Sequence, residues 1–361
     1  MLRYARQRGI PVDWTFYCAL GRPGALDDEV RSLGAKILYS PVPIGQKGAF
    51  IRALRTELKA GGYDVVHSHH DLISALYLVS AAGIPLKKRL VHVHNADESV
   101  LTPQPWKQAM LRPLLRQTCL RLADTIVGIS NHTLDTFLVE RPRRVGRDRV
   151  HYYGIDPAPF LAARSDRAEF RQELGLAEDA LIILFAGRMV PEKNPLFAVE
   201  VFAEMRKRNP RVVAAFVGSG SMEQAVAARA NELGVGDSYR FLGWRSDVPE
   251  VMSCCDWFIL PRPEAPMEGL GIAVVEAQLA GLRLLLSRGI ADDPLLPGSV
   301  WARLGLSEGA ERWAEEALKL LEKVPPTPQM AAAQLAQSPF NMGFALTDLL
   351  NLYNEVEVNP R

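Results

Sequence analysis

Cysteine is scarce in this chain of 361 residues, which holds only Cys18, Cys119, Cys254 and Cys255. None of the four forms a CxxC pair or a zinc-type spacing, so the sequence predicts neither a disulfide framework nor a cysteine-ligated metal. The adjacent pair Cys254 and Cys255 precedes an apolar run and is expected to fill a core. We therefore expect a reduced, cytoplasmic protein.

Long hydrophobic runs are also missing. The longest uncharged run, Leu72–Leu86, falls short of the roughly 20 residues that a membrane-spanning helix needs, and it contains Gly83 and Pro85. The first residues alternate arginine with apolar side chains and contain no apolar signal-peptide core. The sequence therefore predicts neither a transmembrane segment nor a signal peptide.

The formal net charge is only +1, but the two halves differ in sign. Residues 1–155 hold 22 Lys+Arg and 13 Asp+Glu, a balance of +9, whereas residues 156–361 hold 20 and 28, a balance of −8. A basic first half suits contact with anionic material, such as a phosphorylated substrate or the inner face of an anionic membrane. No nucleic-acid-binding module is recognisable, so nucleic acid is not an expected partner.

The chain alternates short apolar runs with helical patterns over most of its length. Runs such as 181–186, 212–217 and 257–260 are apolar throughout, which is typical of strands buried on both faces. This alternation predicts an α/β protein with parallel sheets covered by helices on both sides. No strand precedes the helix that begins the chain, so the first sheet is expected to lack its first strand.

The length predicts two domains, with boundaries at 1–155 and 156–340. A last helix within 341–361 is expected to pack back on the N-terminal domain. The expected connection is Gly154–Pro159, where two prolines interrupt regular structure, and a Pro-rich connection precedes the last helix.

One strand–loop–helix stretch, Pro261–Gly281, carries the strongest signal for a site. Its loop holds Glu268, and its helix holds Glu276 among apolar neighbours. A carboxylate in such a helix costs on the order of several kcal/mol without a partner, so a ligand hydroxyl or a cation is the expected compensation. Gly269 and Gly271 leave the loop backbone free to approach a ligand.

Two further strand ends carry candidate phosphate-binding groups. Arg188 follows one strand and Lys193 starts the next helix, so both cations are expected near a helix N-terminus, where they suit a diphosphate. Gly218 and Gly220 form a second glycine-rich turn, which alone is a weak signal. The GxGxxG fingerprint of dehydrogenases is absent, which disfavours a dinucleotide-binding enzyme.

Histidines concentrate on two predicted strands of the first half: His67, His69, His70, His92 and His94. Alternate positions share a strand face, so a metal site is geometrically conceivable. No carboxylate in a ligand pattern accompanies them, and we expect no metal. We predict instead that His94 makes a polar contact with substrate, while the others are hydrogen-bonded core or rim residues.

The segment Trp106–Leu122 predicts a long helix that combines cationic and apolar residues. It is interpreted either as a packed helix with a solvated basic face or as a peripheral contact with an anionic membrane.

Several motifs, in order along the chain, resemble family 4 glycosyltransferases of the exopolysaccharide and capsule type. They are YDVVHSHH, HVHN, VGIS and YYGID in the first half, and FAGRMVPEKN, VGSG, YRFLGW and PEAPMEGLGIAVVEAQLAGL in the second. The resemblance spans about residues 10–320. It implies the GT-B fold, with two Rossmann-like domains facing a cleft. It also implies retaining transfer of a sugar from a UDP- or GDP-linked donor, with no metal cofactor.

The same resemblance assigns roles by position. Arg188 and Lys193 would hold the donor diphosphate, Glu268 would contact the donor sugar, and Glu276 would hold the ribose. Other donor contacts would come from the glycine-rich turn and from the loop backbone at Gly218, Gly220, Gly269, Leu270 and Gly271. His94 would face the reacting sugar.

The family pattern begins with a strand and a glycine-rich loop, and neither is present here. We therefore keep a second hypothesis, a catalytically impaired sugar-nucleotide-binding or partner protein. The leading hypothesis is an enzyme of cell-envelope or exopolysaccharide assembly with a glycan or lipid-linked acceptor. A GT-B epimerase would need catalytic acids in the first half that are not apparent.

Overall fold

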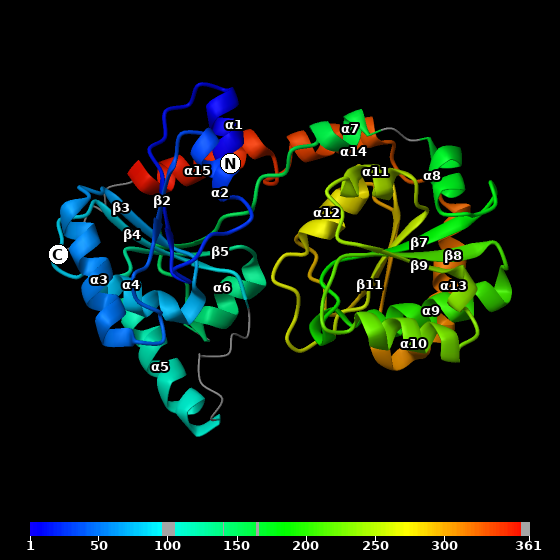
Figure 1. The fold of residues 1–361 in the computed structure, drawn as a ribbon, viewed down its shortest axis with the longest axis horizontal. Helices are drawn as coiled ribbons and strands as arrows, with labels where there is room; N and C mark the ends of the chain where they lie inside the picture. The colour runs from blue at the N-terminus through cyan, green and yellow to red at the C-terminus, as the bar shows by residue number, and fades with distance from the viewer. Residues whose placement is uncertain (96–104, 140, 164–165, 355–361) are drawn as a thin grey trace. The chain divides into compact units, whose positions relative to one another are not determined.

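The computed structural model describes residues 1–95, 105–139, 141–163 and 166–354. They form two compact α/β units: in Figure 1 the first runs from blue to blue-green and includes the red helix α15, and the second runs from green to orange. The first unit comprises residues 1–154 and the chain from Met342 onward, and the second comprises residues 155–341. Among the described residues, no helix combines the length and apolar character needed to traverse a bilayer.

The elements of the first unit are, in chain order, α1 (Leu2–Gln7), β1 (Thr15–Cys18), α2 (Asp27–Ser32), β2 (Lys36–Tyr39), α3 (Lys47–Ala60), β3 (Val65–Ser68), α4 (Ser74–Ala81), β4 (Lys88–Val93), α5 (Pro105–Leu122), β5 (Thr125–Gly128), α6 (Asn131–Leu138), β6 (Asp148–Val150) and α15 (Met342–Asn354).

The elements of the second unit are α7 (Ala158–Ala162), α8 (Arg167–Glu173), β7 (Leu181–Ala186), α9 (Pro195–Arg208), β8 (Val212–Val217), α10 (Glu223–Glu232), β9 (Tyr239–Gly243), α11 (Val248–Ser253), β10 (Trp257–Leu260), α12 (Ile272–Leu279), β11 (Arg283–Ser287), β12 (Trp301–Leu304), α13 (Gly309–Lys319) and α14 (Pro328–Ala336).

Strands of the first unit are paired in parallel, as predicted, but they form two sheets instead of one. Strands β1 and β2 pair with each other, and β3, β4, β5 and β6 pair in sequence order. In a doubly wound sheet of order 3-2-1-4-5-6, the first strand lies between two such groups. Among the described residues no strand lies between these two groups, which accounts for the division into two sheets.

Helix α15 covers one face of the four-stranded sheet. Its Leu349 and Leu352 join the buried Leu90 and Val127 in a small core, with Val65 packed against it. Alternate residues of a strand share a face, so the positions that follow Val65 and Leu90 on this face are histidines. The C-terminal helix therefore helps to enclose the histidine-rich ends of β3 and β4.

The second unit contains one six-stranded parallel sheet of order β12-β11-β10-β7-β8-β9. Numbered within the unit, this is the doubly wound order 3-2-1-4-5-6 read from β9 to β12. The strand order reverses between β7 and β10, which are paired in parallel. In such sheets ligands bind outside the carboxyl ends of the strands at the reversal, which makes this edge the place to look for a site.

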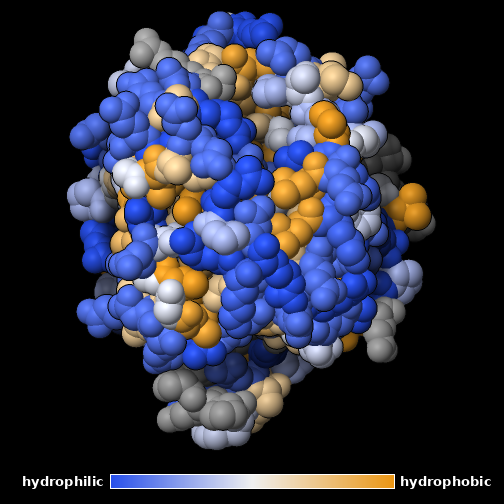
Figure 2. Space-filling view, turned by 90° about the vertical axis from the view of Figure 1, so that its right-hand side faces the viewer, coloured by the Kyte–Doolittle hydropathy of each residue, from blue (hydrophilic) through white to orange (hydrophobic). Residues whose placement is uncertain are grey.

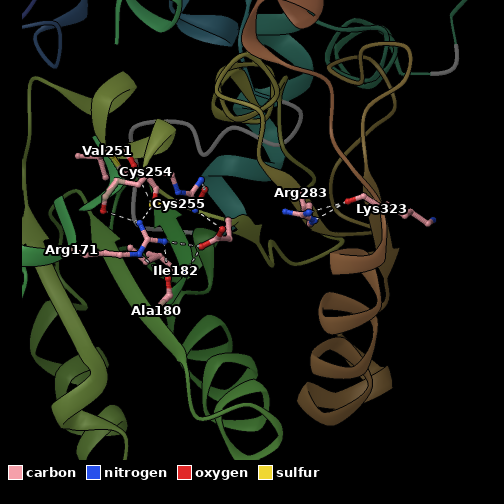
Figure 3. Close-up of polar contacts among 10 residues, drawn as sticks. Arg171, Ala180, Ile182, Val251, Cys254, Cys255, Arg283 and Lys323 are labelled. Carbon is pink, nitrogen blue, oxygen red and sulfur yellow. Dashed lines mark hydrogen bonds and ion pairs between the residues drawn. The ribbon is translucent and has the colours of Figure 1, made fainter. Parts of the chain in front are cut away.

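The amino ends of β7 and β10 are held together by a buried polar network (Figure 3). Arg171 is buried and donates hydrogen bonds to the carbonyls of Ala180 and Cys254. Asp256 pairs with Arg171 and accepts a 2.8 Å hydrogen bond from the backbone N–H of Ile182. Because this network fixes one end of both strands, the loops at their other ends start from fixed positions.

Two short helices lie where the sequence predicts irregular connections. Helix α7 begins inside the predicted linker, because a proline is tolerated in the first turn of a helix. Helix α14 occupies the Pro-rich segment before the last helix. Its N-cap Thr327 accepts a hydrogen bond from the N–H of Met330, and Pro328 takes the first helical position. A threonine followed by proline is a helix-start pattern, but the high proline content of this segment led us to predict an irregular connection.

Hydrophilic residues cover most of the face shown in Figure 2, and hydrophobic residues form separate patches on it. The cores lie beneath the helices, and that of the second unit is built around Trp257, Trp313, Phe185, Phe202 and Phe216.

Helix α12 is tied to the loop after β11 by one buried amide. The Gln278 side chain donates to the carbonyls of Val274 and Pro294, and its oxygen accepts from the N–H of Leu296 and the hydroxyl of Ser299. All four of its hydrogen-bonding positions are used.

Gln278→Met is therefore expected to lower the free energy of unfolding by about 2 kcal/mol or more, because it leaves buried partners of the amide without hydrogen bonds. Urea denaturation checks this. The exposed Gln337→Met, on the helix-capping position of α14, should change stability by less than about 0.5 kcal/mol. Equal effects of the two substitutions would contradict the assignment.

Candidate functional site

The site begins with two loops that follow the paired strands β7 and β10. After β7 the chain passes Gly187 and Arg188 and makes a short 3-10 turn, Pro191–Lys193, before α9. Asn194 then takes a left-handed backbone conformation with φ of 50°, which turns the chain into the helix. The loop after β10 leads to α12 and holds Glu268.

A three-residue ion cluster bridges the two loops. The Nζ of Lys193 lies 2.6 Å from Oε2 of Glu268, and a guanidinium nitrogen of Arg262 lies 3.1 Å from the same oxygen. Arg262 also donates to the carbonyl of Glu192, so it links the two loops a second time. All three charged side chains are mostly buried, with exposed fractions of 16%, 14% and 11% for Lys193, Glu268 and Arg262.

Positive charge exceeds negative charge in this cluster. Burial lowers the pKa of Lys193, the charge and hydrogen bond of Glu268 oppose that shift, and the nearby Arg262 and Arg188 lower it further. Two cations, Lys193 and Arg262, thus pair with the carboxylate of Glu268, and Arg188 adds a third positive charge that acts on Lys193. Such an excess in a largely desolvated place favours a polyanion, and a diphosphate supplies the oxygen acceptors that guanidinium and ammonium groups bind.

Gly218 and Gly220 lie against the loop that carries Arg188. A Cβ on Gly218 would stand 2.0 Å from the carbonyl oxygen of Gly187, and one on Gly220 would stand 2.3 Å from that of Met189. The N–H of Met189 donates to the carbonyl of Ser219. Close backbone packing therefore accounts for both glycines, which support the first loop whether or not they also contact a ligand.

Gly271 is the N-cap of α12 and has φ of 75°, whereas Gly269 is not in the left-handed region. Leu270 between them is buried. Glu276 lies in the second turn of the helix and is half-buried, and no hydrogen bond or ion pair holds its carboxylate within the described part of the chain. Burial raises its pKa. An acid in this condition is available to hydroxyl donors of a ligand.

His94 is in the first unit, directly after β4, and is fixed from several sides. The backbone N–H of His94 donates to Oδ1 of Asp71 at 2.5 Å, and the backbone and side-chain amides of Asn95 donate to the same carboxylate. The Tyr153 hydroxyl lies 2.5 Å from Nδ1 of His94, and Nδ1 of His69 lies 3.0 Å from its Nε2. Burial lowers the pKa of His94, which favours a neutral imidazole at this position.

Residues 1–159 match the family model "Glycosyltransferase Family 4", and residues 166–290 match the model "Glycosyl transferases group 1". The chain is a glycosyltransferase with the GT-B fold.

Among curated relatives, the protein of Bacillus subtilis (strain 168) named "Putative glycosyltransferase EpsF" is 28% identical over 358 residues, covering 97% of this chain and 91% of that protein. The UDP-Gal:alpha-D-GlcNAc-diphosphoundecaprenol alpha-1,3-galactosyltransferase of Escherichia coli is 26% identical over 272 residues, covering 73% and 67%. Among solved structures, Anabaena Alr3699/HepE, determined with UDP and with UDP-glucose, has a TM-score of 0.76 at 18% identity and covers 98% of this chain and 94% of its own.

The predicted site residues of this glycosyltransferase are thus divided between the units. The structure joins Lys193 with Glu268 directly and brings Arg188 within electrostatic reach of Lys193. Gly218 and Gly220 pack beneath them, and Glu276 follows in α12. His94 belongs to the first unit and has its own set of partners. The role that the family resemblance assigns to each residue remains a prediction.

Sequence reasoning missed three residues that hold the others in place. Arg262 pairs with Glu268, Asp71 holds the backbone at His94, and Tyr153 contacts the His94 ring. Arg262 and Tyr153 follow strands β10 and β6, where ligands of parallel sheets collect, and that position was the available signal. Asp71 has a left-handed φ of 43°, which its sequence neighbours do not reveal.

The first-unit histidines form a stack of rings on the sheet face that α15 covers. Ring centroids of His67 and His92 lie 5.2 Å apart, and those of His92 and His94 lie 4.8 Å apart. The two nitrogens of His67 contact the Tyr353 hydroxyl at 2.8 Å and Nδ1 of His92 at 3.2 Å. One ring nitrogen from each of His67, His69 and His92 falls within 4.8 Å of the others, so these three could hold a metal.

Burial lowers the pKa of both His67 and His92 well below the usual value for histidine. Charge repulsion from His69, His94 and His151 lowers both pKa values further. The folded chain therefore keeps these rings neutral at pH values where the unfolded chain protonates them. Since the unfolded pKa is about 6.5, the free energy of unfolding should fall as the pH drops below that value.

Between pH 7.5 and 5.5, each of these two imidazoles is expected to remove about 1.4 kcal/mol of stability. Urea denaturation of the wild type and of His92→Leu at both pH values checks this. The variant should lose less stability over the interval, because one titrating ring is gone. Equal pH dependence in the two proteins would show that His92 is not held neutral.

Proposed function

We propose that this glycosyltransferase moves a sugar from a UDP-sugar to a glycan or lipid-linked acceptor in the assembly of cell-envelope or exopolysaccharide material, with retention of the donor's anomeric configuration. We place the reaction on the cytoplasmic side of the membrane, in keeping with four free cysteines. The observation that carries the proposal is the cationic cluster at the strand-order reversal of the second unit, in which Lys193 and Arg262 pair with Glu268 and Arg188 acts on Lys193.

A diphosphate donor fits this cluster because the cluster contains more cations than carboxylates. In the structure, Glu268 compensates Lys193 and Arg262. A bound diphosphate would supply new acceptors to the cations and release Glu268 for the sugar hydroxyls. Anabaena HepE, which shares the fold, was determined with UDP and with UDP-glucose, which supports uridine as the base.

Transfer requires stabilisation of the negative charge that develops on the departing UDP. We assign this to Arg188, Lys193 and the backbone N–H groups at the start of α12, in place of a metal cofactor. Glu276 would accept hydrogen bonds from the ribose hydroxyls, which would satisfy its unpartnered carboxylate. His94, held neutral by burial, would contact the donor sugar as a hydrogen-bonding group.

A lipid-linked acceptor is supported by one relative and by the charge distribution. The name of the Escherichia coli relative specifies an acceptor carried on diphosphoundecaprenol. The first 155 residues of the present chain carry a balance of +9, which suits a phosphorylated acceptor at an anionic membrane. The alternative of a catalytically impaired binding protein is not favoured, because EpsF and the galactosyltransferase are both named as enzymes.

UDP binding gives the most direct test. At 100 times its dissociation constant, UDP should add about 2.7 kcal/mol to the free energy of unfolding, and GDP should add less. Lys193→Ala should weaken UDP binding at least tenfold, because it removes a charge-assisted hydrogen bond to phosphate. Glu276→Ala should weaken it through loss of the ribose contact. Thermal-shift titration and calorimetry measure both effects.

The controls separate binding from transfer. Lys207→Ala, an exposed lysine at the end of α9, should bind UDP like the wild type. Glu268→Gln should still bind UDP, since the cations remain, but should lose sugar transfer. UDP affinity that is unchanged in both Lys193→Ala and Glu276→Ala would overturn the assignment of this site.

Retention is tested by the product itself. With an α-linked UDP-sugar as donor, the anomeric proton of the first-formed product should show the small coupling constant of an α-linkage in proton NMR spectra. A large coupling constant from a β-linked first product would contradict the retaining mechanism while leaving donor binding intact.

A further inference from the structure

Three histidines of the first unit bring their ring nitrogens to one place. His67 lies on β3, His69 follows that strand, and His92 lies on the neighbouring β4. Strands β3 and β4 pair in parallel, so side chains at alternate positions of both strands share one face of the sheet. One nitrogen from each of the three rings falls within 4.8 Å of the other two. The pairing of the strands therefore gathers three imidazoles, which are ligands for zinc, copper and nickel.

The spacing of two of these rings matches that of two ligands on one ion. Nε2 of His67 lies 3.2 Å from Nδ1 of His92. Two nitrogens on one tetrahedral zinc ion lie about 3.3 Å apart, because each bond measures about 2.0–2.1 Å. The third ring, His69, is exposed. A small rotation of this ring would bring all three nitrogens to the spacing of ligands, and its exposure gives an ion a path from solvent.

Outer hydrogen bonds orient two of the rings. Nδ1 of His67 lies 2.8 Å from the hydroxyl of Tyr353 on α15, and Nδ1 of His69 lies 3.0 Å from Nε2 of His94. A histidine that binds a metal through one nitrogen almost always engages the other in such a hydrogen bond, which fixes its tautomer. The Nε2 atoms of His67 and His69 are therefore the ones assigned to an ion.

The third ring is incompletely hydrogen-bonded. His92 is 1% exposed, and its Nε2 is buried without a hydrogen-bond partner among the described residues. A neutral imidazole has one N–H and one lone pair, so the described part of the chain meets only one of the two requirements of this ring. An unmet polar group in a buried place costs free energy. A ligand in the cluster would compensate for that cost.

The donor set selects the class of metal. Imidazole nitrogens suit zinc, copper and nickel, whereas magnesium, calcium and manganese prefer oxygen ligands. Zinc bound by three protein ligands keeps a fourth position for water or another ligand. The sequence led us to expect no metal because no carboxylate pattern accompanies the histidines. Three imidazoles form a zinc site without a carboxylate, so that expectation does not exclude one here.

We propose that His67, His69 and His92 form a site for one zinc ion, and that the bound ion restrains His94 through its hydrogen bond with His69. The site belongs to the first unit and differs from the proposed donor site in the second. Zinc binding itself is independent of the proposed function. Its effect on sugar transfer rests on that function, which assigns His94 to the donor sugar.

The restraint follows from the partners of His94. Its Nδ1 lies 2.5 Å from the Tyr153 hydroxyl, and its Nε2 contacts Nδ1 of His69. One of these two contacts has to open before His94 can bond to a sugar hydroxyl, because each ring nitrogen makes one hydrogen bond. An ion on Nε2 of His69 withdraws electron density from that ring and strengthens the hydrogen bond that its Nδ1–H donates to His94. Bound zinc should therefore slow transfer and leave UDP binding unchanged.

Zinc titration of the metal-stripped, untagged full chain tests the site. Calorimetry with zinc chloride, in the absence of nucleotide, should give one zinc ion per chain, and magnesium chloride should give no binding. His69→Gln should weaken zinc binding at least tenfold, because it removes a ligand at an exposed position where the fold is not at risk. Tyr353→Phe should weaken it by a factor of roughly ten through loss of the outer hydrogen bond to His67. The matched control is His132→Gln on α6 of the same unit, which should bind zinc like the wild type.

Cobalt(II) in place of zinc identifies the ligands. Its visible absorption should show nitrogen ligands without a thiolate charge-transfer band, which distinguishes this site from binding at any of the four free cysteines. A thiolate band, wild-type zinc affinity in His69→Gln, equal binding of magnesium, or no zinc binding at all would overturn the proposed site.

Transfer assays on the same preparations test the restraint on His94. With the UDP-sugar in excess over zinc, saturation of the site should slow transfer by a factor of about 2 to 10, the cost of opening one hydrogen bond. His69→Gln should show no such response to zinc, whatever its own rate. An unchanged rate with zinc bound would refute the restraint. A zinc-free protein that binds no UDP would refute the donor site alone, because zinc binding is measured without nucleotide.

Discussion

The parallel pairing of β7 with β10 is the constraint on which the proposed donor site depends. These strands are separated by 70 residues in the chain, yet their pairing brings the loops of Lys193 and Glu268 together at the carboxyl ends of the strands. Asp256 and Arg171 hold the opposite ends of the same strands. A polar network at the amino ends of these strands therefore stabilises the sheet, and their carboxyl ends can carry charges that are not fully compensated.

Much of the fold followed from local patterns in the sequence. The bounds of β7, β8 and β10 agree with the apolar runs 181–186, 212–217 and 257–260, because each run is followed directly by Gly or Pro. The division of the first unit into two sheets depends on which strands pair, which local patterns do not reveal. Helix α14 was not predicted, because its segment is rich in proline. The site was predictable as a list of residues, but its ion pairs were not. Arg262 and Lys193 meet at Glu268 only through tertiary structure.

Incomplete charge compensation occurs at two separate places in the molecule. In the second unit, Lys193 and Arg262 share the carboxylate of Glu268, and in the first unit the Nε of Arg116 is buried with no hydrogen-bond partner among the described residues. Each arrangement carries a desolvation cost, because a buried charged group lacks full compensation by its neighbours. The two places differ in their surroundings, since the first is polar and enclosed by loops, whereas the second lies on helix α5.

The chain leaves the first unit at Gly154 and returns to it at Met342, and near these points Ile155 donates a 2.8 Å hydrogen bond to the carbonyl of Phe340. During synthesis on the ribosome, the second unit can therefore complete its core before the first unit receives α15 and buries Leu90 and Val127. The half of the protein that is made first is finished last. A single proteolytic cut near residue 155 would likewise leave the two units joined through the second crossing.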